Sequence, residues 1–221
     1  GQVQFEIGVQ STNLETVDAI HRKMDFDILR RNVMRIHEGR NIHQHLDLIA
    51  GLPHEDYNSF LKSFDDVYAL KPDQFQLGFL KVLKGSFMEQ DSANHGIVYQ
   101  DKAPYEVLKT NLLSYDEILK LKGICEMVEV YYNSGQFNYA MEFLGKLYDR
   151  PSKLYYELSL YYEKNGLDQV AHSRLKRYDL LLDFYKESVL KLIKSEQQED
   201  FLKCFKEILI LDLNLRENMK S

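Results

Sequence analysis

The sequence predicts an α/β fold followed by an all-α region, and three observations support this. Over residues 4–83, short apolar runs alternate with amphipathic helical stretches, which is typical of βα units around a parallel sheet. Residues 84–103 are loop-like, with two glycines, Gly85 and Gly96, as breaks. Beyond Pro104 the sequence indicates only helices. We therefore place a domain boundary at this proline and expect two domains, residues 1–104 and 105–221.

The first segment of the βα region is predicted to contain a strand and two helices. Apolar residues alternate with glutamate and glycine over Phe5–Val9 before a polar Gln-Ser-Thr, which predicts a strand that ends in a loop. Asn13 can cap a helix that runs to about Lys23, and Asp27 can cap the second helix. Gly39 then ends the second helix.

Two further strands and one helix complete the βα region. The segment IHQHLDLIAGLP, residues 42–53, is predicted to be a strand followed by a Gly/Pro turn. A helix from Asp56 to about Leu70 carries apolar residues at helical spacing, and Lys-Pro-Asp ends it. The segment QFQLGFLKVL, residues 74–83, is the third predicted strand.

The C-terminal region begins with a capping box. Ser114 and Glu117 have the spacing that caps a helix, which should run to about Asn133. Two later segments are similar, YYNSGQFNYAMEFL from Tyr131 and YYEKNGLDQVAHSRL from Tyr161. A tetratricopeptide-like repeat is one interpretation, and we favour ordinary helical hairpins over it. We expect the tyrosine pairs in these segments to serve as core packing first.

Charge and composition argue against several classes of protein. The net charge of -6 over 221 residues argues against a general nucleic-acid surface. The apolar stretches fall short of the ~20 residues that a membrane-spanning helix needs, and the first residues do not resemble a signal peptide. Two cysteines, Cys125 and Cys204, are too few for a disulfide framework. We expect a cytoplasmic protein that binds neither nucleic acid nor a membrane.

Polar residues near the carboxyl ends of the predicted strands are the candidate binding residues, because function collects there in parallel βα folds. Gln10 follows the first strand, although a bond to nearby backbone explains it equally well. Arg22 lies at the far end of the first helix, where its basic neighbours favour a solvated face. Asp47 interrupts an apolar run, and burying an unpaired carboxylate costs on the order of several kcal/mol. A hydroxyl or amine of a ligand would be a suitable partner for Asp47.

The histidines do not form a recognisable metal motif. On a strand, His43, His45 and Asp47 would share one face, but next-but-one residues lie about 6.5 Å apart, whereas ligand bonds are about 2 Å long. Nucleophilic catalysis is not indicated either, because Ser11 lacks a G-x-S-x-G elbow. We therefore expect neither metal ligands nor catalytic residues in this chain.

Three segments together closely resemble the second half of the radical S-adenosylmethionine barrel. They are EIGVQS with Arg22 twelve residues after Gln10, then LDLIAGLPHE, and then PDQFQLGFLKVLKGS. The resemblance covers about residues 4–86 and is nearest to the cobalamin-dependent type and to oxygen-independent coproporphyrinogen oxidase. The region from about Tyr105 resembles the helical domain of bacterial members with a cobalamin-binding domain. Those members are often labelled as relatives of the anaerobic Mg-protoporphyrin IX monomethyl ester oxidative cyclase.

This resemblance implies a fold and a set of cofactor contacts. Residues 1–104 would be the C-terminal part of a TIM-like (β/α) barrel, about its strands four to six. Gln10, Arg22 and Asp47 would contact S-adenosylmethionine. Ile49 would lie beside its adenine. A guanidinium can grip the cofactor carboxylate by two parallel hydrogen bonds, and a carboxylate can accept hydrogen bonds from the ribose diol. The parent protein would be an iron-sulfur oxidoreductase in which a 5'-deoxyadenosyl radical abstracts hydrogen from an unidentified substrate.

The chain also departs from this family. The family binds three irons of a [4Fe-4S] cluster through a C-x3-C-x-x-C motif, which is absent here, and Cys125 and Cys204 cannot replace it. We therefore expect a fragment of a longer radical enzyme that is inactive alone and binds neither cluster nor S-adenosylmethionine with useful affinity. Whether the parent uses cobalamin stays open. An exposed edge along Phe5–Val9 would let the fragment pair with a copy of itself. The alternative is a non-enzymatic helical module that binds a protein partner.

Overall fold

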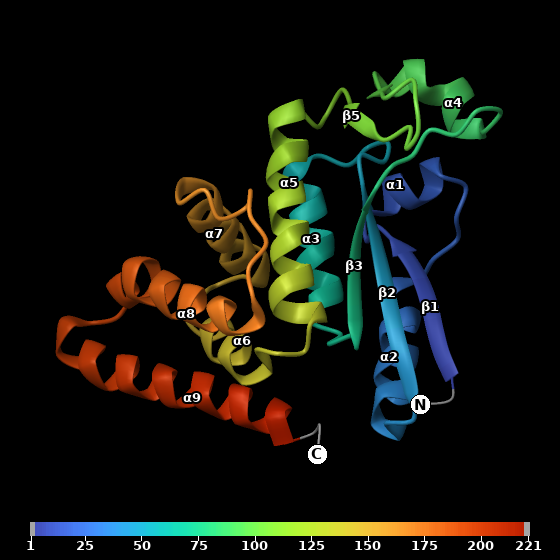
Figure 1. The fold of residues 1–221 in the computed structure, drawn as a ribbon. Helices are drawn as coiled ribbons and strands as arrows, with labels where there is room; N and C mark the ends of the chain where they lie inside the picture. Colours follow the sequence, from blue (N-terminus) through green and yellow to red (C-terminus); the bar gives the residue numbers. More distant parts are fainter. Residues whose placement is uncertain (1–2, 219–221) are drawn as a thin grey trace. The chain divides into compact units, whose positions relative to one another are not determined.

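The computed structural model describes residues 3–218 and contains a parallel sheet followed by a helical region (Figure 1). Three strands form the parallel sheet in the order β1-β2-β3, namely β1 (Val3–Gln10), β2 (Ile42–Ala50) and β3 (Gln74–Phe79). The chain after residue 114 is mainly helical. The predicted mixed α/β architecture with a helical C-terminal part is therefore confirmed.

Short helices and one small strand pair join these two parts of the chain. The sheet is accompanied by α1 (Leu14–Ala19), α2 (Phe26–Gly39) and α3 (Tyr57–Tyr68). The connecting segment contains α4 (Phe87–Asp91), the 3-10 helix η1 (Ser92–His95), and the antiparallel strands β4 (Val98–Tyr99) and β5 (Val107–Lys109). The helical region contains α5 (Tyr115–Val128), η2 (Glu129–Asn133), α6 (Asn138–Gly145), α7 (Pro151–Lys164), α8 (Arg174–Phe184), η3 (Tyr185–Val189), η4 (Leu190–Leu192), η5 (Ser195–Gln197) and α9 (Gln198–Asn218). Among residues 3–218, the structure has no helix with the length and apolar character needed to cross a membrane.

The parallel sheet has a covered face and an open face. The covered face of β2 is fully buried and consists of Gln44, Leu46, Leu48 and Ala50. Helix α2 packs over this face, where Gln44 Nε2 donates a 3.2 Å hydrogen bond to the backbone oxygen of Val33. Helix α3 adds the ring of Phe64, whose centroid lies 5.0 Å from that of Phe75 in β3. The open face of β2 is only partly buried and consists of His43, His45, Asp47 and Ile49. The period of two along a strand therefore separates apolar core from polar surface.

Helix α1 is shorter than the sequence predicts. It ends at Ala19 because His21 adopts a left-handed conformation, with φ 55°, and turns the chain. The backbone nitrogen of His21 donates to the oxygen of Asp18 (2.9 Å), and that of Arg22 donates to the oxygen of Val17 (3.0 Å). This pair of bonds is the Schellman arrangement that closes helix C-termini. Arg22 therefore lies in the loop beyond the helix, not at its end.

Helix α2 begins two residues earlier than predicted. Its cap is Asp25, whose Oδ1 accepts a 3.0 Å hydrogen bond from the backbone nitrogen of Ile28. The predicted cap, Asp27, is wrong because this residue lies in the first turn, where it pairs with Arg30 at 2.9 Å. The helix includes Gly39 as its last residue, in agreement with the prediction.

The segment after β3 leaves the parallel sheet earlier than predicted. The backbone oxygen of Leu80 accepts a 2.8 Å hydrogen bond from Val107 in β5, so β3 ends at Phe79. The prediction that no strand follows Pro104 is wrong, because β5 pairs with β4. A strand of three residues has too few positions to show alternation, and its partner lies elsewhere in the chain.

The predicted capping box is confirmed at the start of α5. The backbone nitrogen of Ser114 donates to Glu117 Oε2 at 2.8 Å, and the backbone nitrogen of Glu117 donates to Ser114 Oγ at 3.3 Å. Helix α5 continues directly into the π-helix η2, which ends at Asn133. The predicted helix therefore forms over its full length, with a change of helix type in its last turn.

The two similar tyrosine-containing segments form part of the helical core. In each one the chain turns at a glycine in the left-handed region, Gly135 with φ 61° and Gly166 with φ 62°. The hydroxyls of Tyr131 and Tyr162 are hydrogen bonded at 2.7 Å, and both side chains are buried. Tyr155 is buried as well. The expected packing role of these tyrosines is confirmed.

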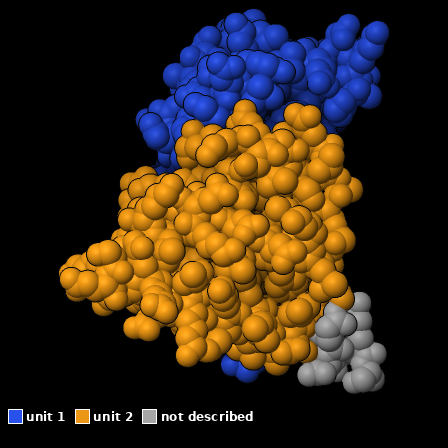
Figure 2. Space-filling model, turned by 60° about the vertical axis from the view of Figure 1, so that its left-hand side comes forward, with its two compact units in different colours: residues 1–125 blue, residues 126–221 orange. Residues whose placement is uncertain are grey.

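The chain divides into two compact units, residues 1–125 and 126–221 (Figure 2). The division falls within α5, whereas the sequence places a domain boundary at Pro104. Strand β4, strand β5 and most of α5 thus belong with the parallel sheet in the first unit. The domain boundary at residue 104 stays a prediction.

Gly51, the residue directly after β2, lies close to Val107 of β5, and a substitution tests this close approach. Its φ is 88°, and a Cβ at this position would lie 2.7 Å from Val107 Cγ1. We expect Gly51→Ala to lower the free energy of unfolding by about 2 kcal/mol, because the strain and the clash add. Gly145→Ala is the control, since nothing lies within 4 Å of its added carbon. Urea unfolding measures both variants, and equal stability of the two would contradict this account of Gly51.

Candidate functional site

The predicted binding residues lie around Gly8, on the open face of the sheet. Gly8 in β1 pairs with Asp47 in β2, and Asp47 pairs with Gln76 in β3. Paired residues on neighbouring strands direct their side chains to the same face. Because Gly8 has no side chain, the space above it lies directly beside the Asp47 carboxyl group.

The side chains of Gln10 and Arg22 converge on this space. A Cβ on Gly8 would lie 2.7 Å from Gln10 Nε2 and 3.3 Å from Arg22 Nη1. The register of β1 shifts between Gly8 and Gln10, and Gln10 has a φ of 70°. Such an irregularity bends a strand and redirects a side chain. An amide and a guanidinium are therefore held together over Gly8, and a side chain at this residue would displace them.

Asp47 lies in a partly buried polar environment. Its side chain is 30% exposed, which corrects the expectation of full burial within an apolar run. Burial raises the pKa of its carboxyl group, Glu6 adds to this effect, and His45 opposes it. His45 Nε2 lies 3.0 Å from Asp47 Oδ1, but neither buried atom has a hydrogen bond of good geometry. The exposed part of the carboxyl group, and not these two buried atoms, is what a ligand can reach.

Ile49 lies on the same face, one step nearer the carboxyl end of β2. It pairs with Gly78, and a Cβ on Gly78 would lie 3.7 Å from Ile49 Cγ1. The absence of a side chain at Gly78 leaves this apolar group partly exposed. The structure thus brings Gln10, Arg22 and Asp47 together and places Ile49 next to them.

The donors and acceptors of this face fit S-adenosylmethionine, but the chain does not fit an iron-sulfur cluster. A guanidinium, an amide and a carboxylate over a glycine suit the carboxylate and diol groups of S-adenosylmethionine. An iron-sulfur cluster that needs three cysteines does not fit, because the whole sequence holds two, and they lie in different compact units. Within residues 3–218, no group of three or more His, Cys, Asp or Glu side chains is placed to hold a metal ion.

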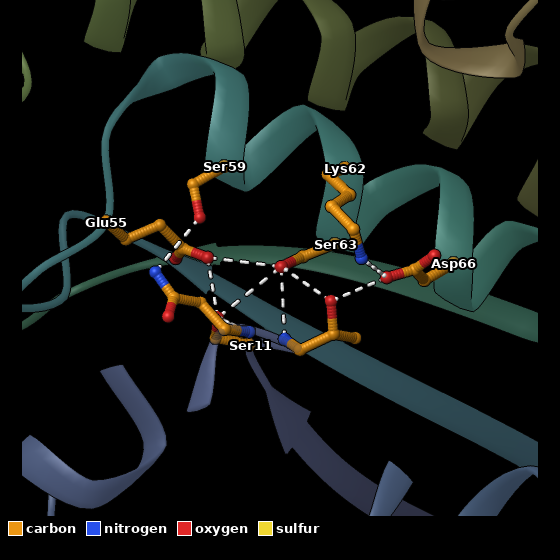
Figure 3. A network of polar contacts seen from close by, with 8 residues as sticks. Ser11, Glu55, Ser59, Lys62, Ser63 and Asp66 are labelled. Carbon is orange, nitrogen blue, oxygen red and sulfur yellow. Dashed lines mark hydrogen bonds and ion pairs between the residues drawn. The ribbon is translucent and has the colours of Figure 1, made fainter. Parts of the chain in front are cut away.

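A buried polar network beside the candidate site was not predicted (Figure 3). Glu55, before α3, is 1% exposed and accepts hydrogen bonds from Ser11 Oγ (2.6 Å) and Ser63 Oγ (3.1 Å). Burial, more than any other effect, raises the pKa of Glu55 to about 7, although the two serine hydrogen bonds oppose this. The network joins α3 to the loop that follows Gln10. No sequence pattern marks it, since its members are 8 to 52 residues apart.

Three histidines and one aspartate lie in loops and short helices outside the sheet. His95 Nε2 is 2.9 Å from Asp91 Oδ2, and the ring of His95 lies 5.1 Å from that of His54. The ring of His21 lies 4.5 Å from that of Phe87 in α4. A hydrogen bond from a neighbouring asparagine, with His95 and His21, lowers the pKa of Asp91 below its usual value. These contacts hold α4 and η1 against the loops after α1 and β2.

Comparison with known families finds a match to the helical region. A family described as a protein of unknown function, DUF4080, matches residues 93–221, which is more than half of the chain. The chain belongs to the DUF4080 family. This domain is associated with cobalamin-binding radical S-adenosylmethionine proteins. No curated protein matches the chain. The DUF4080 match covers the helical region, whereas the residues around Gly8 precede it.

Proposed function

We propose that the open face of the parallel sheet binds S-adenosylmethionine in a radical enzyme. The observation that carries this proposal is the convergence of Gln10 Nε2 and Arg22 Nη1 over Gly8, beside Asp47. The association of DUF4080 domains with cobalamin-binding radical S-adenosylmethionine proteins supports it. The parallel sheet, with helices on one face and polar groups on the other, is compatible with a segment of a (β/α) barrel.

Each residue around Gly8 has a distinct role in this proposal. Arg22 binds the carboxylate of the methionyl group, since a guanidinium offers two parallel donors. Asp47 accepts hydrogen bonds from the ribose hydroxyls through the exposed part of its carboxyl group. Gln10 offers a donor and an acceptor between these two groups. Ile49 supplies the apolar contact for the adenine.

The chain binds and orients the cofactor in this proposal, and the iron-sulfur cluster belongs to other parts of the enzyme. Bound S-adenosylmethionine supplies the adenosyl group for hydrogen abstraction from a substrate of unidentified structure. The proposed parent is thus an oxidoreductase or cyclase-like enzyme. The alternative of a helical interaction module requires exposed aromatic groups. Tyr131, Tyr155 and Tyr162 are buried, whereas Tyr115 in α5 and Tyr139 in α6 are exposed, so this alternative stays a prediction.

Titration of the chain with S-adenosylmethionine, followed by ¹H–¹⁵N NMR under anaerobic conditions, tests the proposed contacts. We expect weak binding, with a dissociation constant on the order of 1 mM, because the cluster that anchors the cofactor is not part of this site. The amide signals of Gly8, Gln10, Asp47 and Ile49 should shift together. Arg22→Lys keeps the charge but removes the paired donors, and it should weaken binding about tenfold, as loss of a charged hydrogen bond predicts.

Arg31→Lys is the matched control, because Arg31 is an exposed residue of α2. This variant should bind as the original chain does. Signal changes confined to residues away from Gly8, or equal affinity in the Arg22 and Arg31 variants, would show that the cofactor does not bind this face.

A further inference from the structure

The network around Glu55 holds the loop that follows Gln10 through hydroxyl groups. Ser11 Oγ accepts a 3.0 Å hydrogen bond from the backbone nitrogen of Asn13, and Ser63 Oγ accepts one of 3.0 Å from that of Thr12. Both serine hydroxyls then donate to a single oxygen, Oε1 of Glu55. Two consecutive backbone amides of the loop are therefore tied to this carboxyl group through one hydroxyl each.

The direction of each proton in the network follows from its geometry. A hydroxyl has one proton, and Thr12 Oγ1 directs its proton to Asp66 Oδ2, the nearer of its two acceptors, at 2.7 Å. The protons of Ser11 and Ser63 are both directed to Glu55. Hydrogen bonds to an ionised carboxylate are about twice as strong as those to a neutral group, and chains of hydrogen bonds polarise one another. Ionised Glu55 therefore strengthens the hold on the loop, and protonation weakens it.

The neighbouring side chains do not hold Glu55 in a single protonation state. Its second oxygen, Oε2, is buried and has no hydrogen-bond partner among the described residues. Asp56, the cap of α3, is the charged neighbour that acts on it, and this negative charge favours the protonated form. Asp66 reaches Glu55 only through Thr12 and Ser63, and Lys62 pairs with Asp66 at 2.6 Å. No cation among the described residues neutralises the carboxylate directly.

We propose that Glu55 is a positioning residue whose protonation state sets how firmly the Gln10–Asn13 loop is held against α3. Gln10 has a left-handed backbone conformation, with φ 70°, and it directly precedes Ser11. Such a conformation persists where neighbouring structure enforces it. The network supplies that enforcement, so the carboxylate form of Glu55 favours the arrangement in which Gln10 lies over Gly8. An effect on cofactor binding rests on the proposed function. The coupling between the protonation of Glu55 and the Gln10–Asn13 loop, in contrast, is a property of the chain alone.

A pH titration of the chain by ¹H–¹⁵N NMR between pH 5 and 9 tests the coupling without any ligand. The amide signals of Gln10, Thr12 and Asn13 should titrate together, with a midpoint near the pKa of Glu55, which is about 7. Glu55→Gln should abolish this shared titration. Ser63→Ala removes a hydrogen bond that favours the ionised form, so the midpoint should move to higher pH.

Ser59→Ala is the matched control. Ser59 lies in the same helix as Ser63 and accepts a hydrogen bond from Asn13 Nδ2, whereas the hydrogen bonds to Glu55 come from Ser11 and Ser63. This variant should keep the original midpoint. His54 precedes Glu55 in the chain, so its ring signals are recorded in the same series. The proposal is wrong if the loop amides do not titrate, if they follow His54 in the Glu55→Gln variant, or if Ser63→Ala leaves the midpoint unchanged.

Discussion

Replacing Asp212 by alanine is expected to lower the free energy of unfolding by about 3 kcal/mol, because two amides in the first turn of α6 lose their acceptor. Asp212 lies in α9 and is 5% exposed. Its Oδ1 accepts from the backbone nitrogen of Tyr139 at 3.1 Å, and its Oδ2 accepts from that of Ala140 at 2.8 Å. The residue at the cap position of α6, Phe137, offers no side-chain acceptor. Asp212 therefore caps α6 from a distant helix, and its negative charge also suits the positive end of the helix dipole.

Urea unfolding of three variants separates this capping role from a general effect of charge. Asp212→Asn retains an acceptor oxygen and should cost about 1 kcal/mol. Asp179→Ala removes an exposed carboxylate from α8 and should stay within about 0.5 kcal/mol of the original chain. If Asp212→Ala is no more destabilising than Asp179→Ala, the two hydrogen bonds do not stabilise the helical unit.

The stability of the chain should depend on pH through Glu55. Burial raises the pKa of this carboxyl group from its usual 4.5 to about 7 in the folded chain. A raised pKa means that the folded state binds the proton more tightly than the unfolded state does. The stabilising contribution is therefore complete below pH 4.5 and is lost as the pH rises through 7, because the cost of burying the charge outweighs the serine hydrogen bonds that strengthen when Glu55 ionises. The shift corresponds to about 3 kcal/mol at most, at 1.36 kcal/mol per pKa unit.

Comparison with Glu55→Gln isolates this contribution, because glutamine does not titrate at this position. We expect the difference in unfolding free energy between the two proteins to change by about 3 kcal/mol between pH 4.5 and 8.5, with the original chain losing stability relative to the variant as the pH rises. Ser59→Ala, which changes a neighbouring hydroxyl and no titratable group, should give a difference that does not vary with pH. Parallel curves for the original chain and Glu55→Gln would show that Glu55 titrates normally.

The sequence predicted the elements whose signals are local. Alternation and helical spacing located the three parallel strands and most of the helices, and the Ser114–Glu117 capping box lies where its spacing indicated. The errors are in features that depend on distant partners. Strand β5 forms by pairing with β4 and with the segment after β3, and no three-residue pattern reveals such a partner.

The candidate site was predictable only in part. Position at the end of a strand or helix singled out Gln10 and Arg22, and interruption of an apolar run singled out Asp47. The meeting of Gln10 and Arg22 over Gly8, however, follows from two left-handed residues, Gln10 and His21. Residues other than glycine rarely adopt this backbone conformation, and the sequence does not indicate which residues do. Asp47 was expected to be buried because the apolar residues Leu46 and Leu48 flank it. Those flanking residues belong to the opposite face of the strand.

The alternation along β2 also has a consequence for how this chain can vary over evolution. Gln44, Leu46, Leu48 and Ala50 maintain the core, whereas His43, His45, Asp47 and Ile49 determine the chemistry of the open face. Substitutions in the second set can alter what is bound at a lower cost in stability, because these side chains are only partly buried whereas those of the first set are fully buried. One strand of nine residues thus holds two sets of positions that selection can change independently.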